Sequence, residues 1–202
     1  MSNYVITIAR GYGSGGKTIG KQLAAQLGIP FYDSQISEVA STLCSGEGSK
    51  LQGSKLTKAL NRIPARETAC DTFVSDDDLF QAQNSIIQEL AKMQSCIIAD
   101  LCANYILRSR SNVLSVYVGA PENSCVGTVQ KLYGLSKEEA NQVIDKIDNY
   151  RSAYYTYYTG GEKWDDPMHY DLTLNTGNMD YDDAVRTIMN AAKVKFGDNL
   201  RV

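Results

Sequence analysis

The stretch ARGYGSGGKTIG at residues 9–20 combines the residue types from which proteins build phosphate sites. It matches the phosphate-loop pattern GxxxxGK[ST] at every fixed position, through Gly11, Gly16, Lys17 and Thr18. In this pattern backbone N–H groups surround an anion, the following helix adds partial positive charge, the lysine reaches the outer phosphates and the hydroxyl binds magnesium. The alternative is a glycine-rich turn that fits by accident. The pattern predicts a nucleotide-phosphate site made of Gly11, Gly13, Ser14, Gly15, Gly16, Lys17 and Thr18.

Two aspartates follow apolar runs and could complete such a site. Asp33 follows the run IPFY, and Asp100 follows the run SCIIA. A carboxylate at either position could orient an acceptor or hold the water shell of a metal. We therefore treat Asp33 as a candidate catalytic residue beside Lys17, and Asp100 as a candidate metal ligand beside Thr18. Each aspartate also has a structural alternative, Asp33 as a turn residue and Asp100 as a helix N-cap.

A long helical pattern carries a third group of charged residues. It begins at Ser136, continues to about residue 158, and contains Lys146, Asp148 and Arg151. Asp148 and Arg151 are three residues apart and are therefore neighbours on a helix. A basic segment that closes over phosphates would stabilise the charge that develops as a phosphoryl group moves. All three are candidate lid residues, and Arg151 is also a candidate catalytic residue. The alternative is an exposed, ion-paired helix.

Short β-rich runs alternate with helical patterns along the chain. The fold that this order implies must position the glycine-rich loop and the charged residues. The expected strands are 5–9, 29–32, 95–100, 112–118 and 170–175, and helical patterns lie between or after them. Strands separated by helices imply parallel crossovers and a sheet covered on both faces, an α/β sandwich of three layers. Because ligands bind beyond the carboxyl ends of such strands, the glycine-rich loop, Asp33, Asp100 and Asn175 should converge on one edge.

Residues 45–78 differ from the rest of the chain, since they are polar, contain glycines and are only weakly periodic. They predict an insertion with one or two short helices. Insertions in α/β domains often carry ligand contacts. Arg62 and Arg66 could bind an anionic substrate there, although a solvated position is the alternative for each of them.

Composition limits the classes of partner. The 202 residues include 20 basic and 23 acidic side chains, a net charge of −3, which argues against a general nucleic-acid or anionic-membrane surface. No apolar run approaches the roughly 18 residues of a membrane span, and no secretory leader is evident, so we expect a cytoplasmic protein. Five scattered cysteines and one histidine argue against a disulfide framework or a zinc site. The length suits a single domain over residues 1–202.

The chain resembles the bacterial cytidylate kinase-like family, relatives of the nucleoside monophosphate kinases. The resemblance runs from residue 5 to about residue 192 and rests on the segments YGSGGKTIGKQLAAQLGIPFYD, LFQAQNSIIQELA, CANYILRSRSNV, YGLSKEEA and RSAYYTYYTGGEKWDDPMHYDLTLNT. It implies a P-loop NTPase fold with ATP and Mg²⁺, an acceptor-binding helical insertion and a helical, arginine-bearing lid at about 136–168. Carried over to the matching positions, the resemblance assigns residues 13–18 to the donor phosphates and Lys146, Asp148 and Arg151 to the lid. Asp33 matches the acid at the end of the family's second strand.

One departure from that family bears on function. Where the family usually has Gly-Arg before Cys-Ala, this sequence has Asp100 and Leu101. An arginine there would contact phosphate through its planar donor fork, which leucine cannot do. Two functions therefore stay open. One is ATP-dependent phosphoryl transfer to a small phosphorylated or hydroxyl acceptor, for which the resemblance implies CMP and the loop alone also allows a metabolite kinase; the other is nucleotide binding by a sensor or interaction protein with little kinase activity. A GTPase switch is not supported, because NTGN at 175–178 lacks the expected guanine-reading acid. Acceptor identity and oligomeric state stay open.

Overall fold

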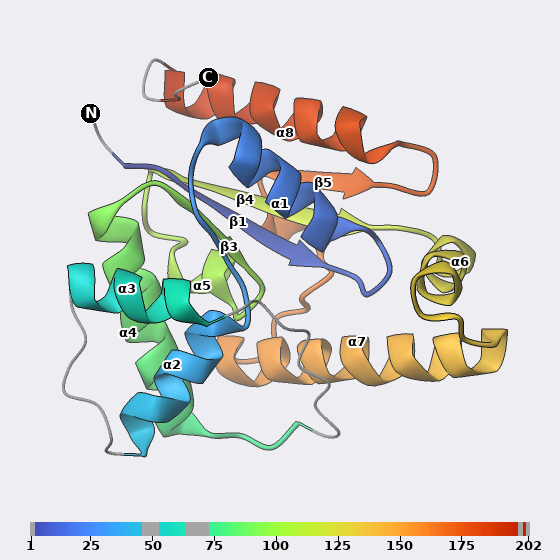
Figure 1. The fold of residues 1–202 in the computed structure, drawn as a ribbon, viewed down its shortest axis with the longest axis horizontal. Coiled ribbons are helices and arrows are strands. Elements are labelled where there is room, and N and C mark those ends of the chain that lie inside the picture. The colour runs from blue at the N-terminus through green and yellow to red at the C-terminus, as the bar shows by residue number, and fades with distance from the viewer. Residues whose placement is uncertain (1–2, 46–52, 64–72, 198–199, 201–202) are drawn as a thin grey trace.

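A five-stranded parallel sheet forms the centre of the protein (Figure 1). The computed structural model describes residues 3–45, 53–63, 73–197 and 200. The strand order is β2-β3-β1-β4-β5. The strands are β1 (Val5–Arg10), β2 (Phe31–Tyr32), β3 (Cys96–Ala99), β4 (Val113–Gly119) and β5 (Leu172–Asn175). The predicted α/β class with five parallel strands is confirmed.

Strand β1 occupies the middle of the sheet and decides where a ligand can bind. Val5 pairs with Cys96 of β3 on one side and with Val113 of β4 on the other. The chain passes from β1 to β2 and β3 on one side, and only later crosses to β4 and β5. The direction of winding therefore reverses at the carboxyl end of β1. Doubly wound sheets bind their ligands at such a reversal, so the loop after β1 is the expected position.

Helices cover both faces of the sheet (Figure 1). Helices α1 (Gly16–Leu27) and α8 (Tyr181–Phe196) pack on one face through a core that includes Ile8, Ile19, Leu23, Val185 and Ile188. The other face is covered by α2 (Gln35–Cys44), α3 (Ser54–Arg62), α4 (Asp77–Met93) and the short α5 (Ala103–Ile106). Their core includes Ile36, Leu60, Ile87, Leu90 and Ile98. These layers form the predicted three-layer sandwich.

Two further helices lie at the end of the sheet where the strands terminate. They are α6 (Glu122–Tyr133) and α7 (Lys137–Thr159), and a 3-10 turn η1 (Pro167–His169) follows them. Ser136 caps α7 with the predicted capping box, because its side chain accepts from the Glu139 amide while the Glu139 carboxylate accepts from the Ser136 amide. Helix α7 runs beneath the sheet edge in the view of Figure 1 and reaches both α6 and α4.

Several predicted boundaries shift for local reasons. The strand expected at 29–32 is only two residues long, since Pro30 has no N–H to donate to a ladder and pairing begins at Phe31. The N-cap alternative for Asp100 is wrong, because α5 begins at Ala103 and Cys102 occupies its N-cap position. Within the insertion expected at 45–78, the described part contains α3 and the start of α4.

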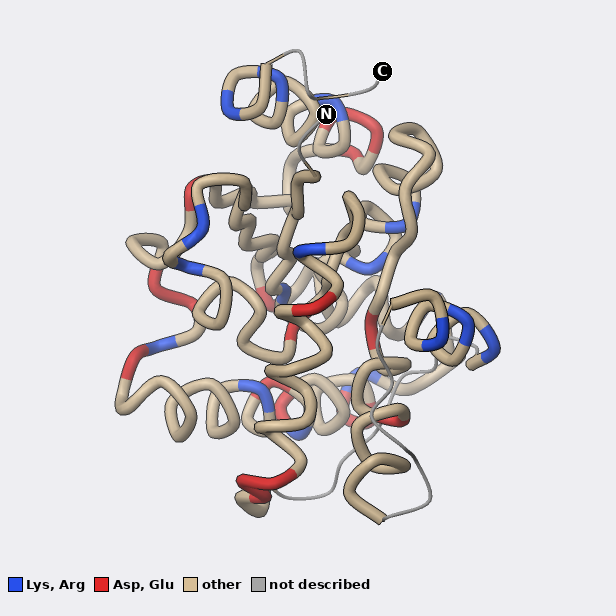
Figure 2. The backbone as a smooth tube through the Cα atoms, turned by 90° about the vertical axis from the view of Figure 1, so that its left-hand side faces the viewer, with Lys and Arg blue, Asp and Glu red and all other residues tan. Residues whose placement is uncertain are grey.

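Charged residues of both signs are interspersed along the backbone in the view of Figure 2. No helix in the described ranges combines the length and apolar character needed to cross a membrane. The described cysteines, Cys44, Cys96, Cys102 and Cys125, are free thiols.

Two helical glycines offer a test of the packing between α1 and the sheet. A Cβ at Gly20 would lie 2.6 Å from the Phe31 ring, whereas a Cβ at Gly127 on α6 would meet nothing within 4 Å. We expect Gly20→Ala to lower the free energy of unfolding by about 1–3 kcal/mol through overpacking. The matched change Gly127→Ala should raise it by about 0.5–1 kcal/mol, because alanine favours a helix. Urea unfolding measures both, and equal effects would contradict the close α1–sheet contact.

Candidate active site

The loop between β1 and α1 has the backbone shape of an anion cradle. Gly13 and Gly15 adopt left-handed conformations, with φ of 83° and 82°. The Ser14 amide donates to the Gly11 carbonyl at 3.2 Å, and the Thr176 hydroxyl donates to the Ser14 carbonyl at 2.7 Å. The second of these bonds ties the loop to the segment that follows β5.

Close packing around this loop requires its glycines. A Cβ at Gly13 would lie 2.7 Å from the carbonyl oxygen of Cys125, and one at Gly16 would lie 2.7 Å from the Cβ of Arg10. At Gly15 a Cβ would overlap the ring of Tyr181. The glycines therefore serve the packing of the loop against its neighbours as well as its φ angles.

A cavity of about 750 Å³ opens beside the loop, between the start of α1 and the end of α6. Within the described ranges, the backbone N–H groups of Gly13 and Gly15 donate no hydrogen bond. The first turn of α1 directs further N–H groups and its positive dipole end toward the same place. Thr18 is exposed there. These features fit a polyphosphate, and the Thr18 hydroxyl could serve as a ligand of the metal ion that accompanies it.

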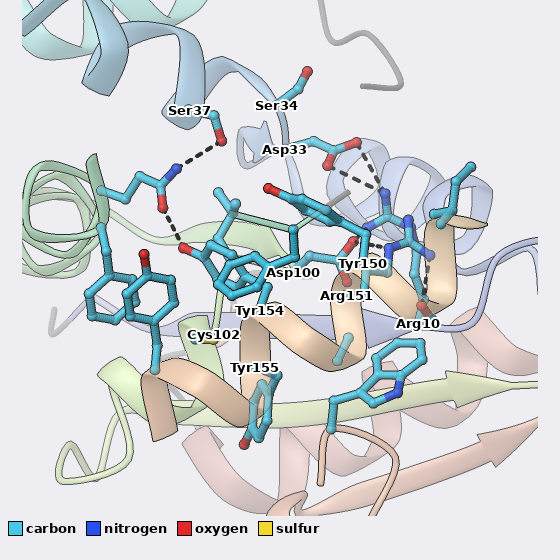
Figure 3. A pocket seen from close by; sticks show the side chains of 18 of the residues that line it. Arg10, Asp33, Ser34, Ser37, Asp100, Cys102, Tyr150, Arg151, Tyr154 and Tyr155 are labelled. Carbon is cyan, nitrogen blue, oxygen red and sulfur yellow. Dashed lines mark hydrogen bonds and ion pairs between the residues drawn. The ribbon is translucent and has the colours of Figure 1, made fainter. Parts of the chain in front are cut away.

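A buried arginine joins this loop to the ends of two other strands (Figure 3). The side chain of Arg10, the last residue of β1, is only 5% exposed. Its Nη2 donates to both carboxylate oxygens of Asp33 at 3.3 Å, and its Nη1 lies 2.9 Å from Asp100 Oδ2. Buried charges need such partners, because an unpaired ion away from water is very costly.

Further ion pairs extend this arrangement into a network of three cations and three carboxylates. Lys17 Nζ lies 3.1 Å from Asp33 Oδ2. On the other side, Arg151 places Nε 3.3 Å from Asp100 Oδ2 and Nη1 3.3 Å from Asp148 Oδ1. The side chains are partly or largely buried, so solvent screens their interactions less than those of surface pairs.

Two of the three predicted lid residues, Asp148 and Arg151, fix helix α7 to the phosphate loop. Both carboxylate oxygens of Asp148 accept from the Tyr12 amide, at 2.9 and 3.1 Å, and Arg151 Nη1 donates to the Arg10 carbonyl at 3.0 Å. Burial raises the pKa of Asp148, an effect that Arg151 and the Tyr12 amide oppose. Asp148 and Arg151 form an ion pair, as the alternative of an exposed, ion-paired helix predicted. They face the phosphate loop, however, and not solvent alone.

The turn after β3 has a strained backbone. Asp100, Leu101 and Cys102 adopt left-handed conformations in succession, with φ of 56°, 58° and 55°. Such conformations cost about 1–2 kcal/mol per non-glycine residue. The Asp100 amide donates to the Ile8 carbonyl at 2.9 Å, and the Asp100 carbonyl accepts from the Ala103 amide at 3.1 Å. The turn directs the Asp100 carboxylate to Arg10 and Arg151, and Leu101 lines a second cavity.

This second cavity, which we call the aromatic pocket, has a volume of about 330 Å³. Its walls come from the ends of β1 and β3, from α2, α4 and α7, and from the segment after α7. They include Leu79, Phe80, Leu101, Tyr150, Tyr154, Tyr158 and Trp164. Phe80 and Tyr158 stack with ring centroids 3.9 Å apart. Tyr154 donates to Gln83 Oε1, and Gln83 Nε2 donates to Ser37 Oγ at 3.2 Å. Burial raises the pKa of Tyr154, so its phenol stays neutral.

Helix α7 buries some of its tyrosines and exposes others. Tyr154 and Tyr155 both line the aromatic pocket, and the Tyr155 hydroxyl also accepts from Asn104 Nδ2 at 2.9 Å. Burial raises the pKa of Tyr155 to about 12. Tyr157 is 52% exposed.

The predicted site residues fall into two groups. The structure brings together Lys17, Asp33, Asp100, Asp148 and Arg151, beside the predicted loop of Gly11, Gly13, Ser14, Gly15, Gly16 and Thr18. Lys146 and Arg62 are exposed on α7 and α3, outside the described linings of both cavities, and Arg66 lies outside the described residues. A metal-binding role for Asp100 stays a prediction, and its contacts with two guanidinium groups favour a role in orienting them.

Sequence reasoning missed Arg10, Gln83 and the aromatic pocket. Arg10 had a detectable feature, since it is a charged residue that ends an otherwise apolar run directly before the glycines. Gln83 lies on the apolar side of an amphipathic helix, where a polar residue had no local partner to indicate its role.

Helix α7 can be detached from the loop by one substitution. We expect Asp148→Ala to remove the acceptor of the Tyr12 amide and to destabilise the protein by about 1.5–3 kcal/mol, the usual range for a hydrogen bond to a charged group. Hydrogen exchange at the Tyr12 amide should accelerate. Asp145→Ala, an exposed change on the same helix, is the control and should leave that exchange rate unchanged. Unaltered Tyr12 exchange in Asp148→Ala would contradict this docking contact.

Comparison with known proteins agrees with this geometry. A solved but uncharacterized protein from Eubacterium ventriosum ATCC 27560 has a TM-score of 0.74 at 24% identity, with 95% of this chain and 99% of the other covered. A gluconokinase from Sinorhizobium meliloti 1021 gives 0.53 at 14% identity, covering 98% and 95%. A shikimate kinase from Bacteroides thetaiotaomicron gives 0.52 at 12% identity, covering 94% and 98%. At these identities the likeness shows a shared P-loop kinase fold.

Comparison by sequence gives the family. The search of curated proteins found no match. The model of the cytidylate kinase-like family matches residues 5–178, which includes the phosphate loop, both aspartates that pair with Arg10, and the whole of α7. The chain therefore belongs to the cytidylate kinase-like family.

Proposed function

We propose that this protein transfers the γ-phosphoryl group of ATP to a hydroxyl group of a small acceptor in the aromatic pocket. The observation that carries the proposal is the position of Arg10 and Tyr12, which line both the loop cavity and the aromatic pocket. Two adjoining cavities, one with an anion cradle, allow donor and acceptor to meet in line. Such positioning, with electrostatic stabilisation, is most of what phosphoryl transfer requires from a protein.

On the donor side, the loop amides and Lys17 would hold the phosphates of ATP. The Lys17 ammonium pairs with Asp33 at 3.1 Å, so binding a γ-phosphate there would give this cation a second anionic partner. The Thr18 hydroxyl would be a ligand of Mg²⁺. When bound, the metal neutralises phosphate charge and fixes the phosphate oxygens in position.

On the acceptor side, Asp33 is proposed as the proton acceptor. The acceptor oxygen forms a bond to the γ-phosphorus while the bond from that phosphorus to the leaving oxygen of ADP breaks, and the hydroxyl proton passes to the Asp33 carboxylate. Arg10 orients this carboxylate through two hydrogen bonds. Arg10, Lys17 and Arg151 stabilise the moving charge, and Asp100 positions the two arginines.

CMP is the acceptor that the family description suggests, so it belongs in the test of this proposal. The test is product formation from ATP with a panel of nucleosides, nucleoside monophosphates and small alcohols. Transfer to a hydroxyl group of any one of them supports the proposal, whereas transfer only to the phosphate oxygen of a monophosphate would keep phosphoryl transfer but contradict the hydroxyl acceptor and the role of Asp33. Tight ATP binding without transfer to any acceptor would contradict it and favour the second function, a nucleotide-binding sensor.

Two substitutions separate donor binding from chemistry. We expect Lys17→Ala to weaken ATP binding by about 10- to 100-fold, as for the loss of a charged hydrogen-bond donor. Asp33→Asn should retain ATP binding within a few-fold but lower kcat by at least about 100-fold, because it cannot accept the proton. Lys92→Ala and Asp145→Asn, exposed changes away from both cavities, are the matched controls. Full activity of Asp33→Asn would refute the assigned proton acceptor.

A further inference from the structure

We propose that the acceptor carries no phosphate and no other negative charge: it is a neutral or cationic hydroxyl compound with a flat apolar body. This inference rests on the proposed function and narrows its acceptor. It comes from the charges and surfaces of the aromatic pocket, and it differs from the monophosphate acceptor that the family description suggests.

The aromatic pocket has more acidic than basic side chains in its described lining. The basic residues there are Arg10 and Arg151, while the acidic residues are Asp33, Glu38, Asp76 and Asp100. Both guanidinium groups already have carboxylate partners, at distances of 2.9–3.3 Å. The positive charges of the two arginines therefore balance the negative charges of Asp33 and Asp100. The negative charges of Glu38 and Asp76 remain unbalanced within this lining.

Glu38 and Asp76 supply this excess of negative charge. Within the part of the chain that the structure describes, neither carboxylate forms an ion pair with lysine or arginine. The Asp76 amide donates to the Tyr158 hydroxyl at 2.9 Å, which places Asp76 against the aromatic wall.

A phosphomonoester fits such a lining poorly. It carries a charge of about −1.5 to −2 at neutral pH and is best held by the donor fork of an arginine. The Arg10 nitrogens that face Asp33 and Asp100 could turn to a phosphate only by leaving a buried carboxylate without that partner. Leu101 contributes an apolar surface at the turn where the resembling family usually has an arginine.

The other walls favour a flat, uncharged or cationic body. The rings of Phe80, Tyr154 and Tyr158 contact one another and line the pocket from α4 and α7. Figure 3 shows Tyr150 and Tyr154 along α7, on the side of the pocket that faces Ser37. Aromatic faces stack on flat groups and attract cations. A volume of about 330 Å³ suits a ligand of one or two rings.

Binding can be measured apart from activity. Trp164 is the only tryptophan of the chain and lines the aromatic pocket, so its fluorescence should report occupancy. The probes are tyrosol, tyramine and 4-hydroxyphenylacetate, which share a hydroxyphenyl body and differ in charge. We expect 4-hydroxyphenylacetate to bind at least about tenfold more weakly than the other two, because like charges oppose binding. Tighter binding of this anion would overturn the inference.

Substitutions identify the source of that discrimination. Glu38→Gln combined with Asp76→Asn should reduce the preference for tyramine over 4-hydroxyphenylacetate by several-fold, and asparagine at position 76 can still cap α4. Glu138→Gln, an exposed change at the start of α7, is the matched control and should leave the preference unchanged. An unaltered preference in the double variant would show that these acids do not set it, and would also overturn the inference.

Turnover with cytidine and CMP separates this inference from the proposed function. With ATP as donor, kcat/KM for cytidine should exceed that for CMP by at least about tenfold. Leu101→Arg, which adds a cation to the lining, should raise the CMP value relative to cytidine. A wild-type preference for CMP would overturn the inference and leave phosphoryl transfer intact. Absence of transfer to every acceptor, together with the expected order of probe binding, would instead refute phosphoryl transfer while supporting the charge preference of the pocket.

Discussion

The buried guanidinium group of Arg10 sets a condition that the surrounding structure satisfies. A charge with 5% exposure needs compensating anions, and here Asp33 and Asp100 provide them from the ends of β2 and β3. The strand order β2-β3-β1 places these ends beside β1, so the topology of the sheet is what makes the pairing possible. The strained turn at Asp100 persists in this setting because its carboxylate meets two guanidinium groups.

Helix α7 links the two cavities physically. Asp148 holds the amide of Tyr12 in the phosphate loop, while Arg151 and Tyr154, on the same helix, line the aromatic pocket. A displacement of α7 would therefore change the surroundings of both cavities together. Closure of the region at about 136–168 as a lid stays a prediction, and in this structure the helix already contacts the loop. Such a link suits the proposed phosphoryl transfer, in which both ligands would lie beside one helix.

Residues that line the pocket distinguish this chain from what its family description alone suggests. The phosphate loop and α7 agree with kinase chemistry, whereas Leu101 and the carboxylates of Glu38 and Asp76 give the aromatic pocket an apolar and acidic character. The two cavities can differ in character independently of each other, because largely separate segments build them. The loop depends on β1 and α1, but the aromatic pocket draws on α2, α4 and α7.

Local patterns in the sequence were sufficient to predict the phosphate loop, the parallel strands, the capping box at Ser136 and the neighbouring positions of Asp148 and Arg151. These features depend on residues close together in the chain, where periodicity and spacing act directly. The partners of Arg10, the positions of Asp100 and Leu101 in their turn, and the charge of the aromatic pocket were decided only by the tertiary structure. They require residues 10, 33, 100 and 151 to meet, and burial then determines which charges pair, since only the folded sheet brings these distant segments together away from water.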